Sequence, residues 1–181
     1  MKRDQSFDHL AERYDRLADL TEDPIADWLP TVLPERRRRA IDLGCGAGRH
    51  AVVLAEYFDQ VDAIDLSGPM IRLARRKRAR SNITYLESDI LDVSGQYDFV
   101  TSAATLHHVA DLSDVLRHIR SLVAVGGGVA LADTVSPRPS NPRWWLYGGE
   151  VRKLFRNITR RGVGTRGRSS GWRPGTGWTT G

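Results

Sequence analysis

The sequence predicts an α/β fold built on a doubly wound, mostly parallel sheet. Short apolar runs alternate with amphipathic segments of helical length from residue 39 to residue 134. The first run leads into residues 44–48, Gly-Cys-Gly-Ala-Gly, and the second run ends on Asp65. A strand, a glycine loop, a helix and an acid after the next strand are together typical of a site for an adenosine-bearing cofactor.

The spacing of apolar residues predicts each element in order. Two amphipathic helices precede the sheet, over residues 7–20 and 25–33, and Pro30 interrupts the second. Ser67, followed by Pro69, is expected to cap the amino end of a later helix. Strands are predicted at residues 39–43, 61–65, 83–87, 98–102 and 129–134, and helices at 49–58, 67–79 and 112–123, the last closed by Gly126, Gly127 and Gly128.

The composition indicates a globular protein of a reducing compartment. The 181 residues are enough for one domain with a substantial core. Cys45 is the single cysteine, so an internal disulfide is impossible, and we interpret it as a small buried side chain rather than a nucleophile. The amino terminus lacks the apolar core of a signal peptide, no segment is long enough to span a membrane, and no acid, His or Cys set has metal-ligand spacing. We therefore expect a cytoplasmic protein without a metal.

The positive charge is concentrated at the carboxyl end. Residues 1–134, the predicted cofactor-binding domain, are mildly acidic, although the whole chain has a net charge of +5. Residues 135–159 are expected to form a loop and one further helix, and residues 160–181 a disordered basic tail rich in Gly and Arg. An acidic body makes a nucleic-acid substrate unlikely, and the arginine-rich runs at 36–39 and 75–78 are interpreted as solvated faces.

The glycine loop departs from the dinucleotide-binding pattern. That pattern requires a small residue three positions after its second glycine, and Arg49 occupies this position. Asp42, two residues before Gly44, places a carboxylate where it would repel a pyrophosphate. A carboxylate at this point suits a ligand that carries an ammonium group and no phosphate. The loop therefore favours an adenosine-bearing cofactor other than a dinucleotide.

Residues 41–48, Ile-Asp-Leu-Gly-Cys-Gly-Ala-Gly, resemble the first motif of class I S-adenosylmethionine-dependent methyltransferases. The resemblance covers about residues 6–134 and implies a Rossmann-like sheet, S-adenosyl-L-methionine as the cofactor and methyl transfer as the activity. Further stretches resemble the family in the right order: residues 7–15 its lead-in helix, 65–70 its ribose-binding segment, 87–90 its adenine-binding segment, and 97–109 its fourth strand and the site behind it.

The chemistry of these residues agrees with that cofactor. Gly44 and Gly46 let the backbone approach the ligand closely, because neither carries a Cβ. Asp42 is expected to orient the loop, or a water, near the ammonium group of the ligand. Asp65, at the carboxyl end of a strand, can accept hydrogen bonds from both ribose hydroxyls, and Leu66 offers an apolar face to the adenine. Asp42 and Asp65 could instead be strand-end carboxylates in solvent.

The adenine and methionine ends of the cofactor have their own candidates. Asp89 can accept from the adenine amino group while the amide of Ile90 donates to the ring, although Asp89 could instead be a turn residue. The resemblance implies that Tyr14 closes over the methionine end. The predicted cofactor-binding residues are Tyr14, Asp42, Gly44, Cys45, Gly46, Asp65, Leu66, Asp89 and Ile90.

Methyl transfer from a sulfonium is an in-line displacement, in which the protein mainly aligns the acceptor and excludes water. A general base is needed only where the acceptor is protonated at working pH. His107 and His108 follow the fourth predicted strand, and His107 is the candidate base of the two. Both histidines could instead pack under the next helix or lie in solvent. A small-molecule methyl acceptor is the expected partner, with no membrane, and the oligomeric state is left open.

The chain departs from the family after residue 134. Family members continue with a helix and an antiparallel strand pair, and no such pair is evident here, so the sheet is predicted to be truncated after strand five. Three alternatives therefore stay open. The chain could bind the cofactor without catalysing transfer, it could be an NAD-dependent oxidoreductase, which Arg49 and Asp42 disfavour, or it could bind RNA through the basic tail.

Overall fold

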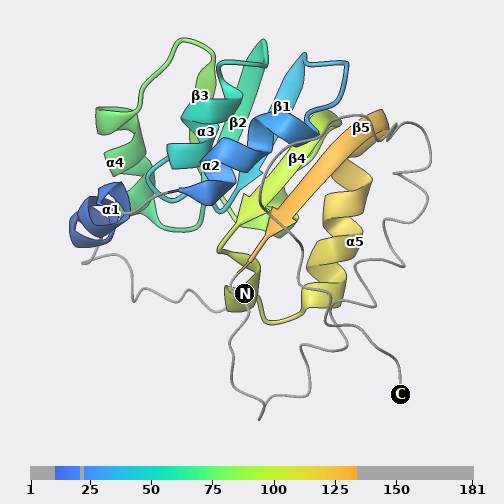
Figure 1. The fold of residues 1–181 in the computed structure, drawn as a ribbon. Helices are drawn as coiled ribbons and strands as arrows, with labels where there is room; N and C mark the ends of the chain where they lie inside the picture. The colour runs from blue at the N-terminus through green and yellow to red at the C-terminus, as the bar shows by residue number, and fades with distance from the viewer. Residues whose placement is uncertain (1–10, 21–22, 134–181) are drawn as a thin grey trace, which may run out of the picture.

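The computed structural model of the protein describes residues 11–20 and 23–133. Five strands form one parallel sheet in the order β3-β2-β1-β4-β5 (Figure 1). The doubly wound parallel α/β fold predicted from the sequence is thereby confirmed. The strands are β1 (Arg39–Leu43), β2 (Gln60–Asp65), β3 (Ile83–Glu87), β4 (Tyr97–Ala103) and β5 (Val123–Ala132).

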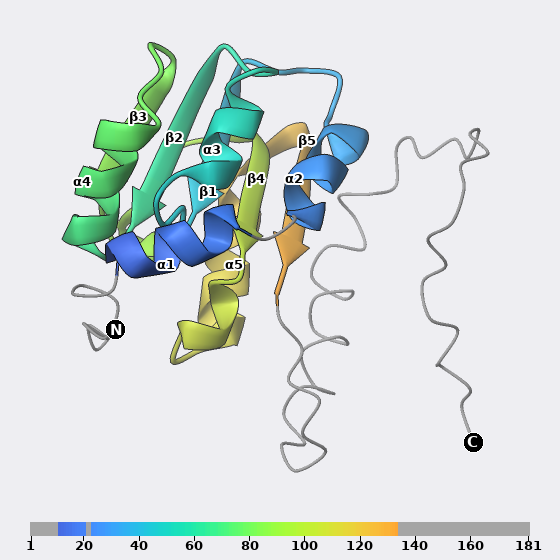
Figure 2. The same cartoon turned by 60° about the vertical axis from the view of Figure 1, so that its left-hand side comes forward.

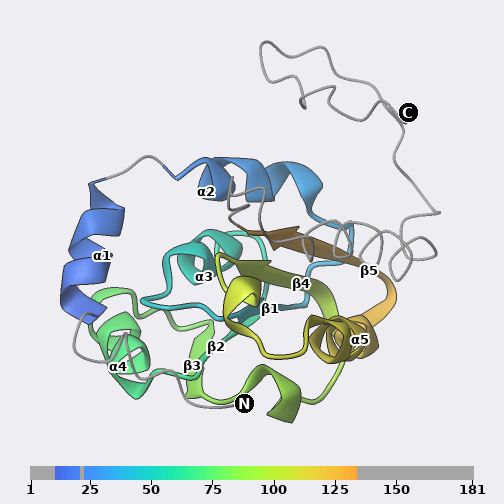
Figure 3. The same cartoon turned by 90° about the horizontal axis from the view of Figure 1, so that it is seen from below.

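Helices cover both faces of the sheet, because successive strand residues point to opposite faces. In β1, Ala40 faces a core that it shares with Leu54 of α3, whereas Ile41 faces a second core that it shares with Leu116 of α5. Figures 2 and 3 show α3 and α5 on opposite sides of the sheet and α1 beside α4. The helices are α1 (Ala11–Asp19), α2 (Pro24–Trp28), α3 (Arg49–Leu54), α4 (Gly68–Lys77) and α5 (Leu112–Leu122).

The strand order places the ends of four strands side by side. β1 lies in the middle, with β2 paired to one edge and β4 to the other. The register sets Leu43 against Ile64, and Asp65 against Glu87 on β3. In such sheets the crevice at the carboxyl ends, where the strand order reverses, is the usual ligand site. The loops after β1 and β4 border this crevice.

The glycines before the last strand were assigned wrongly from the sequence. Residues 126–128 were predicted to close a helix before a strand at 129–134, but β5 begins directly after α5 and includes all three glycines. The register between β4 and β5 shifts between Tyr97 and Phe99. A Cβ on Gly127 would come within 2.9–3.1 Å of backbone oxygens of Tyr97, Asp98 and Ala124. These glycines therefore allow close contact between two backbones at an irregular strand pair.

Other element boundaries differ by a few residues. The helix predicted at 49–58 ends at Leu54, and turns follow it. The predicted helix around Pro30 divides into α2 and a short 3-10 helix, because proline has no N–H with which to continue the α-helical pattern. Ser67 caps α4 as predicted, since its hydroxyl accepts from the Met70 amide at 3.4 Å.

The predictions for residues 135–159 and 160–181 lie outside the described residues. The same is true of the prediction that the sheet ends with its fifth strand, which depends on residues beyond 133. Within the described part of the chain, no helix is long and apolar enough to cross a membrane.

Candidate cofactor site at the carboxyl edge of the sheet

A cavity of about 490 Å³ opens at the carboxyl ends of β1, β2, β3 and β4. Its size lies in the range of pockets that hold small molecules and cofactors. The loops predicted to bind a cofactor therefore meet in one cavity. Its lining comes from four strand ends and the segment before the sheet: residues 44–47, 49 and 50 at β1, residues 65–70 and 72 at β2, residues 87, 88 and 90 at β3, residues 103–105, 108 and 109 at β4, and Tyr14, Asp15, Ala18 and Asp23.

The glycine loop, residues 44–48, bends directly at the end of β1. The amides of Gly44 and Cys45 both donate to the carbonyl of Ile64 at 2.8 Å. Gly44 has a φ of +75°, and a Cβ at this position would overlap Thr105, whose hydroxyl donates to the Gly44 carbonyl at 3.1 Å. Gly46 has a φ of +52°, and a Cβ there would meet no atom within 4 Å. The loop is therefore packed against Thr105 at Gly44 and open at Gly46, which lines the cavity.

The carboxylate of Asp65 joins two of the lining loops. Its Oδ2 accepts from the Gly46 amide and its Oδ1 accepts from the Ser67 amide, both at 2.8 Å. One side chain at the end of β2 thus orders both the glycine loop and the start of α4. A carboxylate offers about four acceptor positions on its two oxygens, so these two bonds leave it able to accept from a ligand hydroxyl.

Asp42 lies inside the sheet on β1 and does not line the cavity. Asp42 is only 1% exposed. Neither of its carboxylate oxygens makes a full hydrogen bond with the described residues. The backbone amide of Ala51 nevertheless lies near enough to favour the charged form of the carboxyl. Burial raises the pKa of this carboxyl to about 6, with His50 opposing the shift and Asp65 adding to it. A buried acid without a full partner is costly unless a ligand or a proton compensates it.

Of the other predicted site residues, most line the cavity and Asp89 does not. The Asp89 carboxylate accepts from the Leu91 amide at 3.0 Å and caps a short 3-10 helix. The thiol of Cys45 lines the cavity but is buried, and burial raises its pKa, which agrees with a structural rather than a nucleophilic cysteine. The predicted residues that line the cavity are Tyr14, Gly44, Cys45, Gly46, Asp65, Leu66 and Ile90.

The two adjacent histidines are placed differently. His108 lines the cavity, whereas His107 does not. The Nδ1 of His107 lies 2.6 Å from Oδ1 of Asp133, and its backbone amide donates to Oδ2 of the same carboxylate at 2.9 Å. The two imidazole rings are 3.9 Å apart. Asp133, just after β5, therefore holds the segment that carries both histidines at the cavity mouth.

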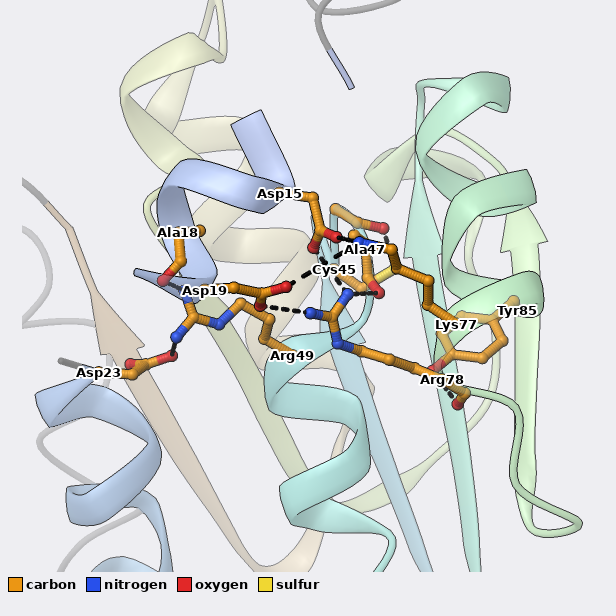
Figure 4. A network of polar contacts seen from close by, with 11 residues as sticks. Asp15, Ala18, Asp19, Asp23, Cys45, Ala47, Arg49, Lys77, Arg78 and Tyr85 are labelled. Atoms are coloured by element: carbon orange, nitrogen blue, oxygen red, sulfur yellow. Dashed lines mark hydrogen bonds and ion pairs between the residues drawn. The ribbon is translucent and has the colours of Figure 1, made fainter. Parts of the chain in front are cut away.

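A buried cluster of charges ties α1 over the cavity (Figure 4). The Asp15 side chain is fully buried and accepts from Lys77 Nζ at 2.6 Å and from Arg78 Nη1 at 2.7 Å. Arg78 also donates to Asp19 at 2.7 Å and to the carbonyl of Ala47 in the glycine loop at 3.1 Å. This cluster links α1, the end of α4 and the glycine loop.

The cluster corrects one expectation. Residues 75–78 were predicted to be a solvated face, and this is wrong for Arg78, whose side chain is 14% exposed. The acids that compensate Arg78 lie about sixty residues earlier in the chain, so no local pattern reveals the pairing. Residues 36–39 are exposed, as predicted.

Several cavity residues were not predicted from the sequence to belong to the site, although Arg49 was noted for its departure from the dinucleotide-binding pattern. Thr105 supports the glycine loop, and Arg49 holds α1 by donating to the Ala18 carbonyl (Figure 4). Asp23 and His50 also line the cavity, with His50 Nε2 3.2 Å from Asp23 Oδ2. The sequence offers one usable signal for Arg49, since it immediately follows the last glycine of the loop. The remaining contacts join segments far apart in the chain.

The charge cluster can be tested with a matched pair of variants. Arg78→Gln is expected to lower the free energy of unfolding by about 2–3 kcal/mol, because the buried Asp15 carboxylate keeps only Lys77 as a partner. Arg76→Gln removes an ion pair between the same two helices whose partners are 61% and 67% exposed, and should cost at most about 0.5 kcal/mol. Urea unfolding followed by circular dichroism measures both, and equal losses would contradict the assignment.

The raised pKa of Asp42 predicts a pH dependence of stability. Because the pKa is about 6 in the folded protein against 3.8 for a free side chain, the folded state holds the proton more tightly, and the carboxyl opposes folding increasingly as the pH rises from 4 to 6. The stability gained by Asp42→Asn should therefore be about 2 kcal/mol larger near pH 7.5 than near pH 4. Urea unfolding at both pH values checks this, with the exposed Asp92→Asn as control. A gain that does not change with pH would refute it.

Comparison with known proteins agrees with this geometry. A family model described as a methyltransferase domain matches residues 41–131. An uncharacterised methyltransferase of Mycobacterium tuberculosis is 33% identical over 121 residues, which are 65% of this chain and 61% of that protein. A ubiquinone biosynthesis O-methyltransferase of Bordetella avium is 31% identical over 119 residues, 62% of this chain and 49% of that protein. The chain thus spans between about half and three fifths of these two relatives.

A solved structure gives the same result. The complex of DhpI with S-adenosylhomocysteine is 29% identical, with a TM-score of 0.57 over 73% of this chain and 67% of that chain. The family match covers the glycine loop, the ends of β1 to β4 and most of β5. The chain belongs to the class I S-adenosylmethionine-dependent methyltransferase family.

Proposed function

We propose that this chain binds S-adenosylmethionine in the cavity and transfers its methyl group to a small-molecule acceptor. The observation that carries the proposal is the joint placement of the open glycine loop and Asp65 at the strand-order switch, inside one cavity of about 490 Å³. Membership of the methyltransferase family supports it. The order of the loops around the cavity suggests which part of the cofactor each would hold.

The chain's residues fit the parts of this cofactor. Asp65 would accept the ribose hydroxyls with the acceptor positions that the loop amides leave available. Leu66 and Ile90 supply apolar surface for the adenine, and Asp89, next to Ile90, remains the proposed acceptor for its amino group. Asp42, which lacks a full hydrogen-bond partner among the described residues, favours an ammonium group near the glycine loop.

The chemistry requires little beyond alignment. When bound, S-adenosylmethionine would supply a methyl group already activated on a positively charged sulfur; in-line attack of the acceptor on the methyl carbon would break the carbon–sulfur bond, with S-adenosylhomocysteine as the leaving group. Tyr14 and Asp15 of α1 line the cavity, and the buried ion pairs of Asp15 hold this helix in place. We propose that α1 thereby excludes water and confines the acceptor, which is the main source of rate acceleration in such a displacement.

A protonated acceptor also needs a base, and the geometry favours His108 for this role. His108 lines the cavity, whereas His107, the candidate from the sequence, is directed to Asp133 outside it. His108 would take the acceptor proton as the new bond to carbon forms. His107 would act indirectly, because its contact with Asp133 holds the segment that carries His108.

The acceptor is proposed to be a small molecule because of the net charge of residues 1–134 and the names of two relatives. Residues 1–134 are mildly acidic, which disfavours a nucleic-acid substrate. The Bordetella avium relative is named as an O-methyltransferase of ubiquinone biosynthesis, and a relative from Deinococcus radiodurans is named as a trans-aconitate 2-methyltransferase. We infer that small phenols and carboxylic acids are the first acceptors to try. The second candidate, a domain that binds the cofactor without transferring methyl, would show binding and no turnover.

Cofactor identity can be tested by calorimetry. S-adenosylhomocysteine should bind the full chain saturably and NAD should not, because the loop lacks the small residue of the dinucleotide pattern and has Asp42 behind it. Asp65→Asn should raise the dissociation constant for S-adenosylhomocysteine about tenfold or more. Asp59→Asn, the same charge change just before the opposite end of β2, should leave it unchanged. Binding of NAD without binding of S-adenosylhomocysteine would overturn the proposal.

The base can be tested by measuring the S-adenosylhomocysteine that is formed from S-adenosylmethionine when phenolic or carboxylic acceptors are supplied. With a phenol, His108→Ala should lower kcat about a hundredfold near neutral pH and remove the acid limb of the pH profile, while His107→Ala should have a small effect. With a carboxylate acceptor, which carries no proton at this pH, both variants should keep their activity. A larger loss in His107→Ala, or no loss in either variant with a phenol, would exclude His108 as the base.

A further inference from the structure

A second depression lies between α1 and α4, apart from the catalytic chemistry. Its volume is about 410 Å³, and it is lined by residues 11–13 and Arg16 of α1 and by Pro69, Arg72, Leu73 and Arg76 of α4. We call it the arginine groove. Ala11 and Leu73, which are 5% and 2% exposed, form its apolar floor. Four guanidinium groups and one carboxylate, that of Glu12, supply its charge.

Ion pairing between the two helices accounts for every acid of α1. Glu12 pairs with Arg76 at 2.7 Å. Asp15 pairs with Lys77 and Arg78, and Asp19 pairs with Arg78. The helix α4 contains no acidic residue, so no further carboxylate is available from either helix.

Three arginines of the groove are therefore left over. Within residues 11–20 and 23–133, the side chains of Arg13, Arg16 and Arg72 have neither a hydrogen bond nor an ion pair. Arg13 and Arg16 are three residues apart and therefore lie on the same face of α1. This face lines the groove on one side, and Arg72 of α4 lines it on the other. Like charges gathered around one depression repel one another, and a bound anion would relieve that repulsion.

We propose that the arginine groove binds the phosphate group of a small phosphate monoester. Guanidinium groups bind phosphate oxygens through paired, charge-assisted hydrogen bonds, and the double charge of a phosphate matches several unpaired arginines better than one carboxylate does. The apolar floor would contact the organic part of the ligand. A nucleic-acid backbone is a poorer match, because Glu12 in the groove and Asp19, one turn beyond Arg16, interrupt the positive surface.

The site is independent of the proposed methyl transfer. Arg13 and Arg16 do not line the cofactor cavity, although Pro69 and Arg72 line both hollows. A double variant, Arg13→Gln with Arg16→Gln, therefore leaves the lining of the cofactor cavity unchanged. Glutamine is a good helix former, so α1 should keep its structure. If the chain failed to bind the cofactor, phosphate binding in the groove could still be observed. If the groove failed to bind phosphate, the proposed methyl transfer would be unaffected.

Calorimetric titration of the full chain tests the groove. The probes are inorganic phosphate and phenyl phosphate, each at constant ionic strength so that general screening does not change. We expect saturable binding of phosphate with a dissociation constant on the order of 1 mM, and tighter binding of phenyl phosphate because its apolar ring can lie against the apolar floor. The double variant Arg13→Gln/Arg16→Gln should weaken both about tenfold or more.

The control is a second pair of arginines at the same spacing. Arg117→Gln with Arg120→Gln removes two exposed arginines from α5, on the far side of the sheet, and should leave both affinities unchanged. Absence of saturable binding would overturn the proposal, and so would an equal loss in the two double variants. Tighter binding of inorganic phosphate than of phenyl phosphate would refute a monoester site, and a preference for a short single-stranded oligonucleotide over both probes would overturn the proposal in favour of nucleic acid.

Discussion

The arrangement of the cavity depends on one carboxylate, that of Asp65, which joins two loops of different origin. The glycine loop follows β1 and the Ser67 turn follows β2, and both give an amide hydrogen to Asp65. Parallel pairing of β1 with β2 brings the two loops to the same edge, and the carboxylate then holds them at a defined separation. The open backbone at Gly46 and the start of α4 are therefore linked directly through a single side chain.

Charge is distributed unevenly around that edge. The acid of β1 is buried without a full hydrogen-bond partner among the described residues, whereas the acids of α1 are all engaged by bases at the end of α4. The first arrangement leaves negative charge uncompensated behind the glycine loop. The second gives a helix with many charged residues a fixed position over the cavity, because breaking buried pairs would leave Asp15 desolvated and alone. A buried acid behind the loop is consistent with a cationic ligand, and a tightly held helix over the cavity is consistent with exclusion of water.

Elements that depend on interactions between neighbouring residues were predicted correctly from the sequence. Strands at 39–43 and 83–87 have the predicted bounds, because short apolar runs bounded by turn residues have few alternatives. The Ser67 cap follows from a hydroxyl that reaches an amide three residues later. The helix end predicted at the three glycines 126–128 was wrong. Glycine can end a helix and can also permit close contact between two backbones, and only the position of β4 distinguishes these two roles.

The sequence by itself determined the succession of strands and helices, the glycine loop and the acid at the end of the second strand, and its resemblance to class I methyltransferases over residues 6–134 indicated the family. The individual elements could be predicted because each depends on residues close to one another in the chain. Tertiary structure alone decided that His108 rather than His107 lines the cavity, that Arg78 is buried against Asp15, and that the side chains of three arginines have no partner within the part of the chain that the structure describes. Each of those outcomes depends on which distant segment packs beside the residue, and pairing across tens of residues leaves no periodic trace in the chain.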